Sequence, residues 1–263
     1  MEMGKHSEYS VECGHSTAIL FIHGILGSPN QFKFLAEALC ALSCDCRAIL
    51  LPGHGGTSRD FYSTPHTAWS AYAHDEIDRM KEKYEKVLLV GHSMGGLFCL
   101  QYAAQYGADG IVLINTPLRV KISLRRVVGG LKTKRRPTAG ESPLTKAYRE
   151  GLSIRMGRFY EYPLWAGNFI GLLRIMHDTL AHLPNVRTPV LVMQAQRDES
   201  VRLSSARLLM DTLSNADARF IPLEGSYHSY FPPEDQRKII EEVTSMIQSI
   251  GCNHSSKEST GCV

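Results

Sequence analysis

The sequence lacks long hydrophobic runs and a strong net charge. In its 263 residues no apolar stretch approaches the roughly 18 residues that a membrane-spanning helix needs. The first fifteen residues are polar and contain no apolar core of a secretory signal. The net charge of +3 gives no whole-molecule reason to bind nucleic acid. We therefore expect a cytoplasmic protein with no transmembrane segment and no nucleic-acid partner.

Cysteine is scarce and odd in number, with seven residues in the chain. In a chain of this length such a count does not predict a disulfide framework. Cys40, Cys44 and Cys46 lie close together, either as a metal site or as small buried residues between a helix and a strand. No second Cys/His pair with zinc-ligand spacing accompanies them. We favour the structural interpretation and expect no metal and no cofactor.

Short apolar runs alternate with longer segments of helical period. The runs predict strands at 17–23, 46–51, 86–91, 110–116, 189–195 and 218–224. Most are continuously apolar, which is typical of parallel strands covered on both faces. Helices are predicted at 29–42, 66–84, 94–106, 203–213 and 234–250. This alternation predicts an α/β protein with a doubly wound, mainly parallel sheet, in which ligands bind at the carboxyl ends of the strands.

One connection is far longer than the others. Residues 118–186 separate two predicted strands and contain helical segments such as 163–183. We therefore predict a helical cap inserted into a core formed by 1–117 and 187–250. The polar tail, 251–263, is predicted to be disordered.

The segment "LLVGHSMGGLFCL" at 88–100 places Ser93 between Gly91 and Gly95, directly after an apolar run. Ser93 is either the cap of the following helix or a nucleophile. The G-x-S-x-G pattern is typical of a nucleophile elbow, a sharp strand-to-helix turn that exposes a strained serine. The helix start also favours negative charge nearby.

A serine nucleophile needs a histidine base, and the base needs an acid to fix its tautomer. In folds with this elbow, the acid and then the histidine follow the serine along the chain. Asp198 and His228 each come just after a predicted strand, so both lie at the same sheet edge as Ser93. Glu199 is the neighbouring competitor for the acid, and we prefer Asp198.

Backbone N–H groups complete such a site by holding the oxyanion of the transition state. Met94 follows the nucleophile directly, and Ile25 follows the strand end "FIHG". We predict the backbone N–H groups of Ile25 and Met94 as the two donors.

The motifs "HGILGS", "LPGHGGTS", "GHSMGG", "QRDESV" and "GSYHS" resemble those of the α/β-hydrolase family, in particular bacterial carboxylesterases and monoacylglycerol lipases. The resemblance spans residues 17 to about 250. It implies the α/β-hydrolase fold, a triad of Ser93, Asp198 and His228, and oxyanion donors at Ile25 and Met94. Substrate identity does not follow, because the cap is the variable part of that fold.

The predicted cap combines apolar and basic stretches. Large apolar residues, among them Trp165, Phe169 and Met176, predict a hydrophobic acyl pocket and so a substrate-binding role. Residues 118–140 hold eight Lys and Arg and no acid, so the rest of the chain is net acidic. This segment is a solvated loop, a weak membrane-surface contact through 118–136, or a site for an anionic substrate or polyanion.

Two classes of function compete. The first is a serine hydrolase that cleaves small carboxylic esters of short-to-medium or aryl acyl groups, with a monoacylglycerol lipase or thioesterase at a lipid surface as its variant. The second is a non-catalytic protein that binds a ligand or a polyanion. The complete order of Ser93, Asp198 and His228 favours the hydrolase. The oligomeric state is not indicated.

Overall fold

The computed structural model describes residues 6–41, 44–121, 140, 142–155 and 157–252. Within these ranges seven strands form one sheet in the order β1-β3-β2-β4-β5-β6-β7. Their bounds are β1 Tyr9–Val11, β2 Thr17–Ile22, β3 Asp45–Ile49, β4 Lys86–His92, β5 Gly110–Ile114, β6 Val190–Ala195 and β7 Ala218–Leu223. Six strands run parallel, and only the edge strand β1 pairs antiparallel, with β3. The mainly parallel sheet is therefore confirmed; β1 is short and largely exposed, and was not predicted.

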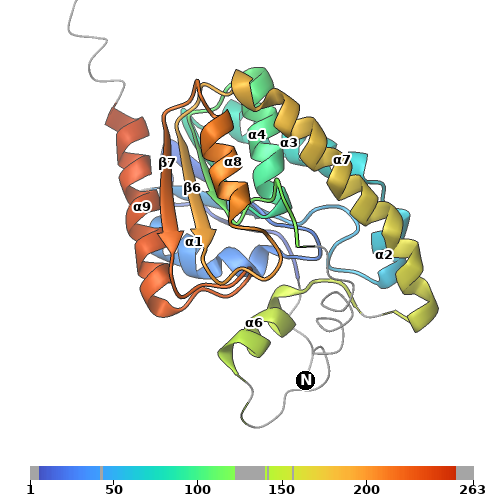
Figure 1. Cartoon of the computed structure of the whole chain (residues 1–263). Coiled ribbons are helices and arrows are strands. Elements are labelled where there is room, and N and C mark those ends of the chain that lie inside the picture. Colours follow the sequence, from blue (N-terminus) through green and yellow to red (C-terminus); the bar gives the residue numbers. More distant parts are fainter. Residues whose placement is uncertain (1–5, 42–43, 122–139, 141, 156, 253–263) are drawn as a thin grey trace, which may run out of the picture.

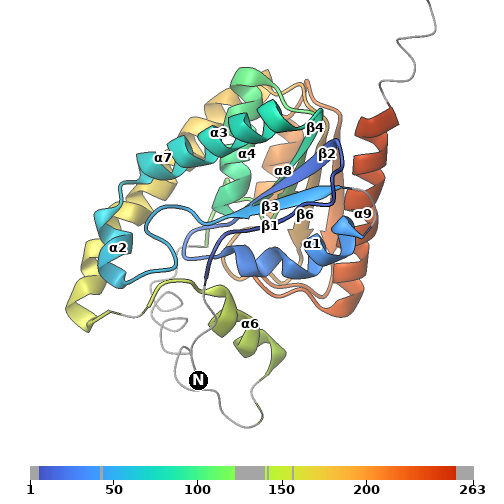
Figure 2. The same cartoon turned by 180° about the vertical axis from the view of Figure 1, so that it is seen from behind.

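Helices cover both faces of the sheet (Figures 1 and 2). In β2, Ile19 and Phe21 join the core beneath α1 (Lys33–Cys40) and α9 (Pro233–Cys252). Leu20 and Ile22 join the core on the other face, beneath α3 (His66–Lys83), α4 (Met94–Tyr106) and α8 (Ser204–Thr212). Successive strand side chains point to opposite faces, so an apolar run buries its residues alternately in the two cores. The doubly wound arrangement is confirmed.

The sheet order brings distant loops to one edge. β4 lies between β2 and β5, and β6 and β7 follow beyond β5. Because these strands are parallel, the segments after their carboxyl ends meet at a common edge. Those segments carry Ile25, Ser93, Asp198 and His228, the residues predicted for the site.

The predicted cap region contains helices where the structure describes it. These are α6 (Pro143–Gly151), the 3-10 helix η2 (Phe159–Trp165), α7 (Ala166–His182) and the short 3-10 helix η3 (Leu183–Asn185). α7 agrees with the helix predicted at 163–183, and it packs against α3 and α4. η2 packs against α2 (Ser58–Ser63), a helix that was not predicted. The division into core and cap remains a prediction, and residues 122–139 lie outside the described part.

Two further sequence predictions have structural counterparts. Helix α1 starts after a 3-10 turn, η1 (Pro29–Phe32), so the predicted helix at 29–42 is split. Helix α9 continues to Cys252, two residues past its predicted end, whereas 253–263 lie outside the described ranges.

No helix among the described residues is both long and apolar enough to cross a bilayer.

The thiols of Cys44 and Cys46 are buried under α1. The Cys44 Sγ donates to the carbonyl of Leu39 at 3.4 Å, and the Cys46 Sγ to the carbonyl of Ala36 at 4.0 Å. Among the described residues, no group of three or more His, Cys, Asp or Glu side chains is arranged to hold a metal ion. The packing of these thiols is what the structural interpretation expects.

We predict that Gly95→Ala destabilises the protein although it lies in a helix. A Cβ on Gly95 would lie 2.0 Å from the backbone carbonyl oxygen of Ile22, so either the end of β2 or the start of α4 must move. We expect a loss of about 1–3 kcal/mol in the free energy of unfolding, measured by urea denaturation. Gly167→Ala in α7 is the matched control, because no atom lies within 4 Å of its added Cβ. It should be neutral or stabilise by up to about 1 kcal/mol, and equal effects of the two changes would contradict the packing argument.

Candidate active site

Ser93 occupies a strained turn between β4 and α4. Its backbone has φ +53° and ψ −123°, in a region that side-chain-bearing residues rarely adopt. A Cβ on Gly91 would lie 2.4 Å from the Cα of Gly96, so the turn can be this tight only with glycine there. The side chain of Ser93 makes no capping hydrogen bond to α4. The geometry is that of the nucleophile elbow and not of an ordinary helix cap.

A chain of two hydrogen bonds runs from Ser93 through His228 to Asp198. The His228 Nε2 lies 3.1 Å from the Ser93 Oγ, and its Nδ1 lies 2.9 Å from the Asp198 Oδ2. A carboxylate only accepts, so the Nδ1 carries the proton and the Nε2 of the neutral ring is free to accept the serine proton. Loops after β4, β6 and β7 thus supply one residue each.

The Asp198 carboxylate is buried and nearly fully hydrogen-bonded. Its Oδ1 accepts the backbone N–H groups of Ser200 and Val201, each at 2.8 Å, and the Gln194 amide donates to its Oδ2 at 3.2 Å. Burial acts to raise the pKa of Asp198, but the nearby His228 and these N–H groups outweigh it and lower the pKa below its ordinary value. The group therefore stays ionised beside the imidazole.

The Asp198 carboxylate also sets the direction in which the pKa of His228 is shifted. Burial acts to lower the pKa of His228, but the charge and hydrogen bond of Asp198, aided by Glu199, raise it above the ordinary 6.5. The Glu199 Oε2 accepts the backbone N–H of His228 at 3.2 Å. Of the two candidate acids, the structure brings Asp198 to the imidazole.

The loop after β2 lies directly against the nucleophile. A Cβ on Gly24 would lie 2.7 Å from the Ser93 Cβ, so Gly24 lets the loop approach closely. Ile25 follows it, and Met94 opens α4, where a backbone N–H has no acceptor within its own helix. Gly24, the neighbour of Ile25 in the chain, and Met94 therefore lie next to Ser93. Their role as an oxyanion hole remains a prediction.

Two buried histidines hold this loop, a function that sequence reasoning did not assign. The His23 Nδ1 donates to the carbonyl of Gly24 at 2.8 Å, and its Nε2 accepts the N–H of Leu51 at 3.0 Å. The His54 Nε2 accepts the N–H of Leu26 at 3.2 Å. Burial lowers the pKa of His54 to about 4 and that of His23 well below its ordinary value. Both rings are therefore neutral near pH 7, and their hydrogen bonds to backbone groups hold the loop after β2 in place.

The three predicted substrate-binding residues lie inside the molecule. Trp165 is buried, and its indole N–H donates to the Ser58 Oγ at 2.9 Å. Met176 is also buried, and the partly buried Phe169 packs against the same core as Met94. This core joins the elbow to α7, but contact with a substrate remains a prediction for all three.

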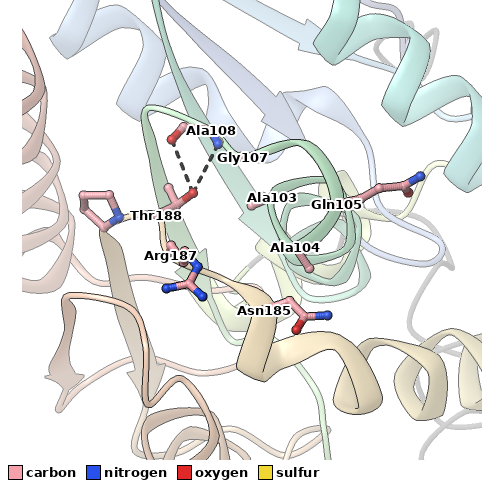
Figure 3. A pocket seen from close by; sticks show the side chains of 9 residues that line it. Ala103, Ala104, Gln105, Gly107, Ala108, Asn185, Arg187 and Thr188 are labelled. Atoms are coloured by element: carbon pink, nitrogen blue, oxygen red, sulfur yellow. Dashed lines mark hydrogen bonds between the residues drawn. The ribbon is translucent and has the colours of Figure 1, made fainter.

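A surface depression lies at the amino-terminal ends of β5 and β6, opposite to the carboxyl ends that carry the candidate site (Figure 3). Its lining comes from the end of α4 and from the segments that enter β5 and β6, including Gln105, Asn185, Arg187 and Thr188. The residues of the candidate site lie at the carboxyl ends of the strands. The depression is therefore separate from the site.

The start of the basic segment is fixed to the acid loop. The backbone N–H of Lys121 donates to the carbonyl of Ser200 at 2.7 Å, and its ammonium donates to the carbonyl of Asp198. Residues 122–136 lie outside the described part of the chain. The proposed membrane-surface contact through 118–136 therefore stays a prediction.

The chain is similar to known proteins over most of its length. The sequence model of the family described as serine aminopeptidase, S33, matches residues 14–235. A thermostable monoacylglycerol lipase of Bacillus sp. (strain H-257) is 28% identical over 225 residues, covering 85% of this chain and 87% of that protein. A carboxylesterase of Bacillus subtilis (strain 168) is 23% identical over 244 residues, covering 90% and 94%. These names support the prediction of a carboxylic ester hydrolase.

Solved structures show the same fold. One comes from work on LipS and LipT, two metagenome-derived lipolytic enzymes; it superposes with a TM-score of 0.72 at 20% identity, covering 95% of this chain and 100% of that one. A monoacylglycerol lipase of Paleococcus ferrophilus superposes with a TM-score of 0.65 at 21% identity, covering 91% and 98%. The match of the family model to most of the chain is decisive: the protein belongs to the serine aminopeptidase S33 family of α/β-hydrolases.

Proposed function

We propose that the protein is a metal-independent serine hydrolase that cleaves small carboxylic esters through an acyl-enzyme. One observation carries the proposal, the hydrogen-bonded series Ser93–His228–Asp198 on a strained elbow. A ligand-binding protein would have no need of a serine hydroxyl aligned with a base and a buried acid. The names of the related lipase and carboxylesterase support an ester as the substrate.

In the first half of the reaction, the Ser93 Oγ attacks the ester carbonyl while its proton passes to the His228 Nε2. Asp198 stabilises the imidazolium that forms, because its carboxylate already accepts the Nδ1–H. The negative charge on the former carbonyl oxygen is held by the N–H groups of Ile25 and Met94. Each such donor contributes about 3–4 kcal/mol to the transition state. When the tetrahedral intermediate collapses, His228 gives the proton to the leaving alcohol.

In the second half, water attacks the acyl-enzyme. His228, neutral again, takes a proton from the water, and the same N–H groups hold the second oxyanion. Collapse releases the acid, and the proton on His228 returns to the Ser93 Oγ. The enzyme ends the cycle unchanged, and the only molecules consumed are the ester and one water.

The substrate is expected to carry a short-to-medium or aryl acyl group. The predicted cap is short, and its first part is strongly basic, which does not suit a deep tunnel for a long acyl chain. The alternative is a monoacylglycerol lipase or thioesterase at a lipid surface, which the names of related proteins favour. Trp165, Phe169 and Met176 are the proposed substrate-side residues of the cap.

Ser93→Ala should abolish turnover and leave the fold intact. Loss of the nucleophile costs roughly 10⁴- to 10⁶-fold in kcat in enzymes of this mechanism. Hydrolysis of p-nitrophenyl acetate and labelling by a fluorophosphonate, followed by mass spectrometry, are the measurements. Ser249→Ala, on the far helix α9, is the control and should keep both activities. Residual activity within tenfold of wild type, or a label on another residue, would refute the assignment.

The pH profile should report His228. The ring must be neutral to accept a proton, and its pKa lies above 6.5, so kcat/KM should fall on the acid side with a midpoint above that value. Asp198→Asn removes the carboxylate charge and its hydrogen bond, and should lower both the midpoint and, by about 10⁴-fold, kcat.

Glu199→Gln is the matched control for the acid. It removes a more distant charge while an amide oxygen can still accept the His228 N–H, so the midpoint should fall only slightly and kcat should change little. Equal losses in the two variants, or a flat profile between pH 5 and 9, would speak against this assignment.

Acyl-chain length should separate the two substrate classes. Each methylene buried in the pocket adds about 0.8 kcal/mol, or roughly fourfold in kcat/KM, until the pocket is full. We expect kcat/KM to level off or fall beyond medium chains in a series of p-nitrophenyl esters and monoacylglycerols, with the matching anilides as slow amide controls. A steady rise to palmitoyl esters, steeper on lipid aggregates, would replace this proposal by the lipase alternative.

A further inference from the structure

His228 lies in a loop, yet both of its peptide groups are held by side chains. The Glu199 carboxylate accepts its N–H, as described above. Its carbonyl accepts two hydrogen bonds, from the Asn115 Nδ2 at 2.9 Å and from the His92 Nε2 at 2.7 Å. A carbonyl oxygen has two lone pairs, so these two donors saturate it. The imidazole ring is joined through the Cβ to the Cα next to this carbonyl, so fixing the carbonyl restricts where the ring can lie.

Asn115 is suited to this contact by its backbone as well as by its side chain. It follows β5 directly, is fully buried and has φ +54°. Among residues other than glycine, Asn tolerates this conformation best. The turn aims its side chain at the neighbouring loops, which a continued strand would not do.

The other end of the Asn115 amide reaches the end of β6, directly before the loop that carries the acid. Its Oδ1 accepts the backbone N–H of Ala195 at 2.7 Å and the Gln194 Nε2 at 3.3 Å. Gln194 also donates to the Asp198 Oδ2 at 3.2 Å. One buried amide therefore connects the end of β6, from which the loop of the acid starts, with the loop of the base after β7.

His92 supplies the second donor in its neutral form. A carbonyl only accepts, so the His92 Nε2 carries the proton. Burial, with His228 nearby, lowers the pKa of His92 to about 3, so the ring remains a single, uncharged donor across the working range of pH. Since His92 precedes Ser93, it relates the base directly to the nucleophile elbow.

We propose that Asn115 is a positioning residue which, together with His92, holds the His228 carbonyl so that the imidazole stays aligned between Ser93 and Asp198. The inference rests on the proposed function, because it assigns a purpose to the base of that mechanism. Misplacing the base by about 1 Å costs up to 100-fold in rate. A role in folding alone would lower stability without altering the turnover of the folded enzyme.

Asn115→Gly is the first test, because glycine keeps the positive φ and removes only the side chain. We expect kcat for a soluble ester to fall about 10- to 100-fold, with KM within about threefold of wild type. Asn115→Asp keeps the acceptor but replaces the donor by an oxygen that faces the His228 carbonyl, and should be at least as damaging.

Thr188→Val is the matched structural control. The Thr188 Oγ1 also makes two hydrogen bonds to the backbone. It accepts the N–H of Ala108 at 3.1 Å and donates to the carbonyl of Ala108 at 3.3 Å. These bonds lie at the amino-terminal ends of β5 and β6, away from the candidate site (Figure 3). It should lower the unfolding temperature and leave kcat unchanged. A loss of kcat equal to that of Asn115→Gly would overturn the inference.

A second pair of variants serves if Asn115→Gly fails to fold. His92→Leu removes the other donor and should lower kcat, whereas H92Q keeps a donor of similar reach and should recover most of the activity. Normal kcat in Asn115→Gly or His92→Leu, with Ser93→Ala inactive, would overturn the inference and leave the proposed function standing. Failure of wild-type Ser93 to react with a fluorophosphonate would overturn both.

Discussion

The tight turn at Ser93 is the constraint on which the site depends. A serine at φ +53° can face the open edge of the sheet only if α4 starts immediately against β2 and β4. That contact needs Gly95 beside the carbonyl of Ile22 and Gly91 beside Gly96. The strain at one residue is thus supported by backbone packing on both sides. The turn exposes the hydroxyl, and it also brings the start of α4 and the loop at Gly24 to the same point.

The electrostatics of the site follow from burial at that edge. An ionised carboxylate as enclosed as Asp198 is tolerated because backbone N–H groups and an imidazole satisfy it. The same charge raises the pKa of His228, whereas no hydrogen bond in the described part of the chain joins the rings of His23, His54 and His92 to a carboxylate, and burial lowers their pKa values. Four histidines near one serine therefore divide into a single group that can take up a proton and three fixed hydrogen-bonding groups.

Much of this arrangement could be predicted from local sequence. Continuous apolar runs predicted the parallel strands, and a polar residue just past each run indicated Ser93, Asp198 and His228. The short strand β1 and the short helix α2 were not predicted, because three to six residues show too little hydrophobic periodicity. The role of Asn115 was not predicted for another reason. In the sequence it is only the polar end of an apolar run, and its hydrogen-bond partners lie 80 and 113 residues further along the chain. The role proposed for Asn115 becomes visible only in the folded structure, where the segment after β5, the end of β6 and the loop after β7 lie side by side.

The residues of the proposed triad and those of the proposed acyl pocket are therefore read from the sequence over different distances along the chain. Ser93, Asp198 and His228 each lie just after a strand that a short apolar run predicts, so each could be found from its own stretch of sequence. In the proposed function, the predicted cap forms the walls around the substrate, and their shape depends on how it packs. In the described part, Trp165 bonds to Ser58, and Asn168 donates to the carbonyls of Phe61 and Thr64. These contacts join segments about a hundred residues apart through single side chains, so the packing of α7 and η2 on α2 is set by long-range pairs that no local pattern in the sequence indicates.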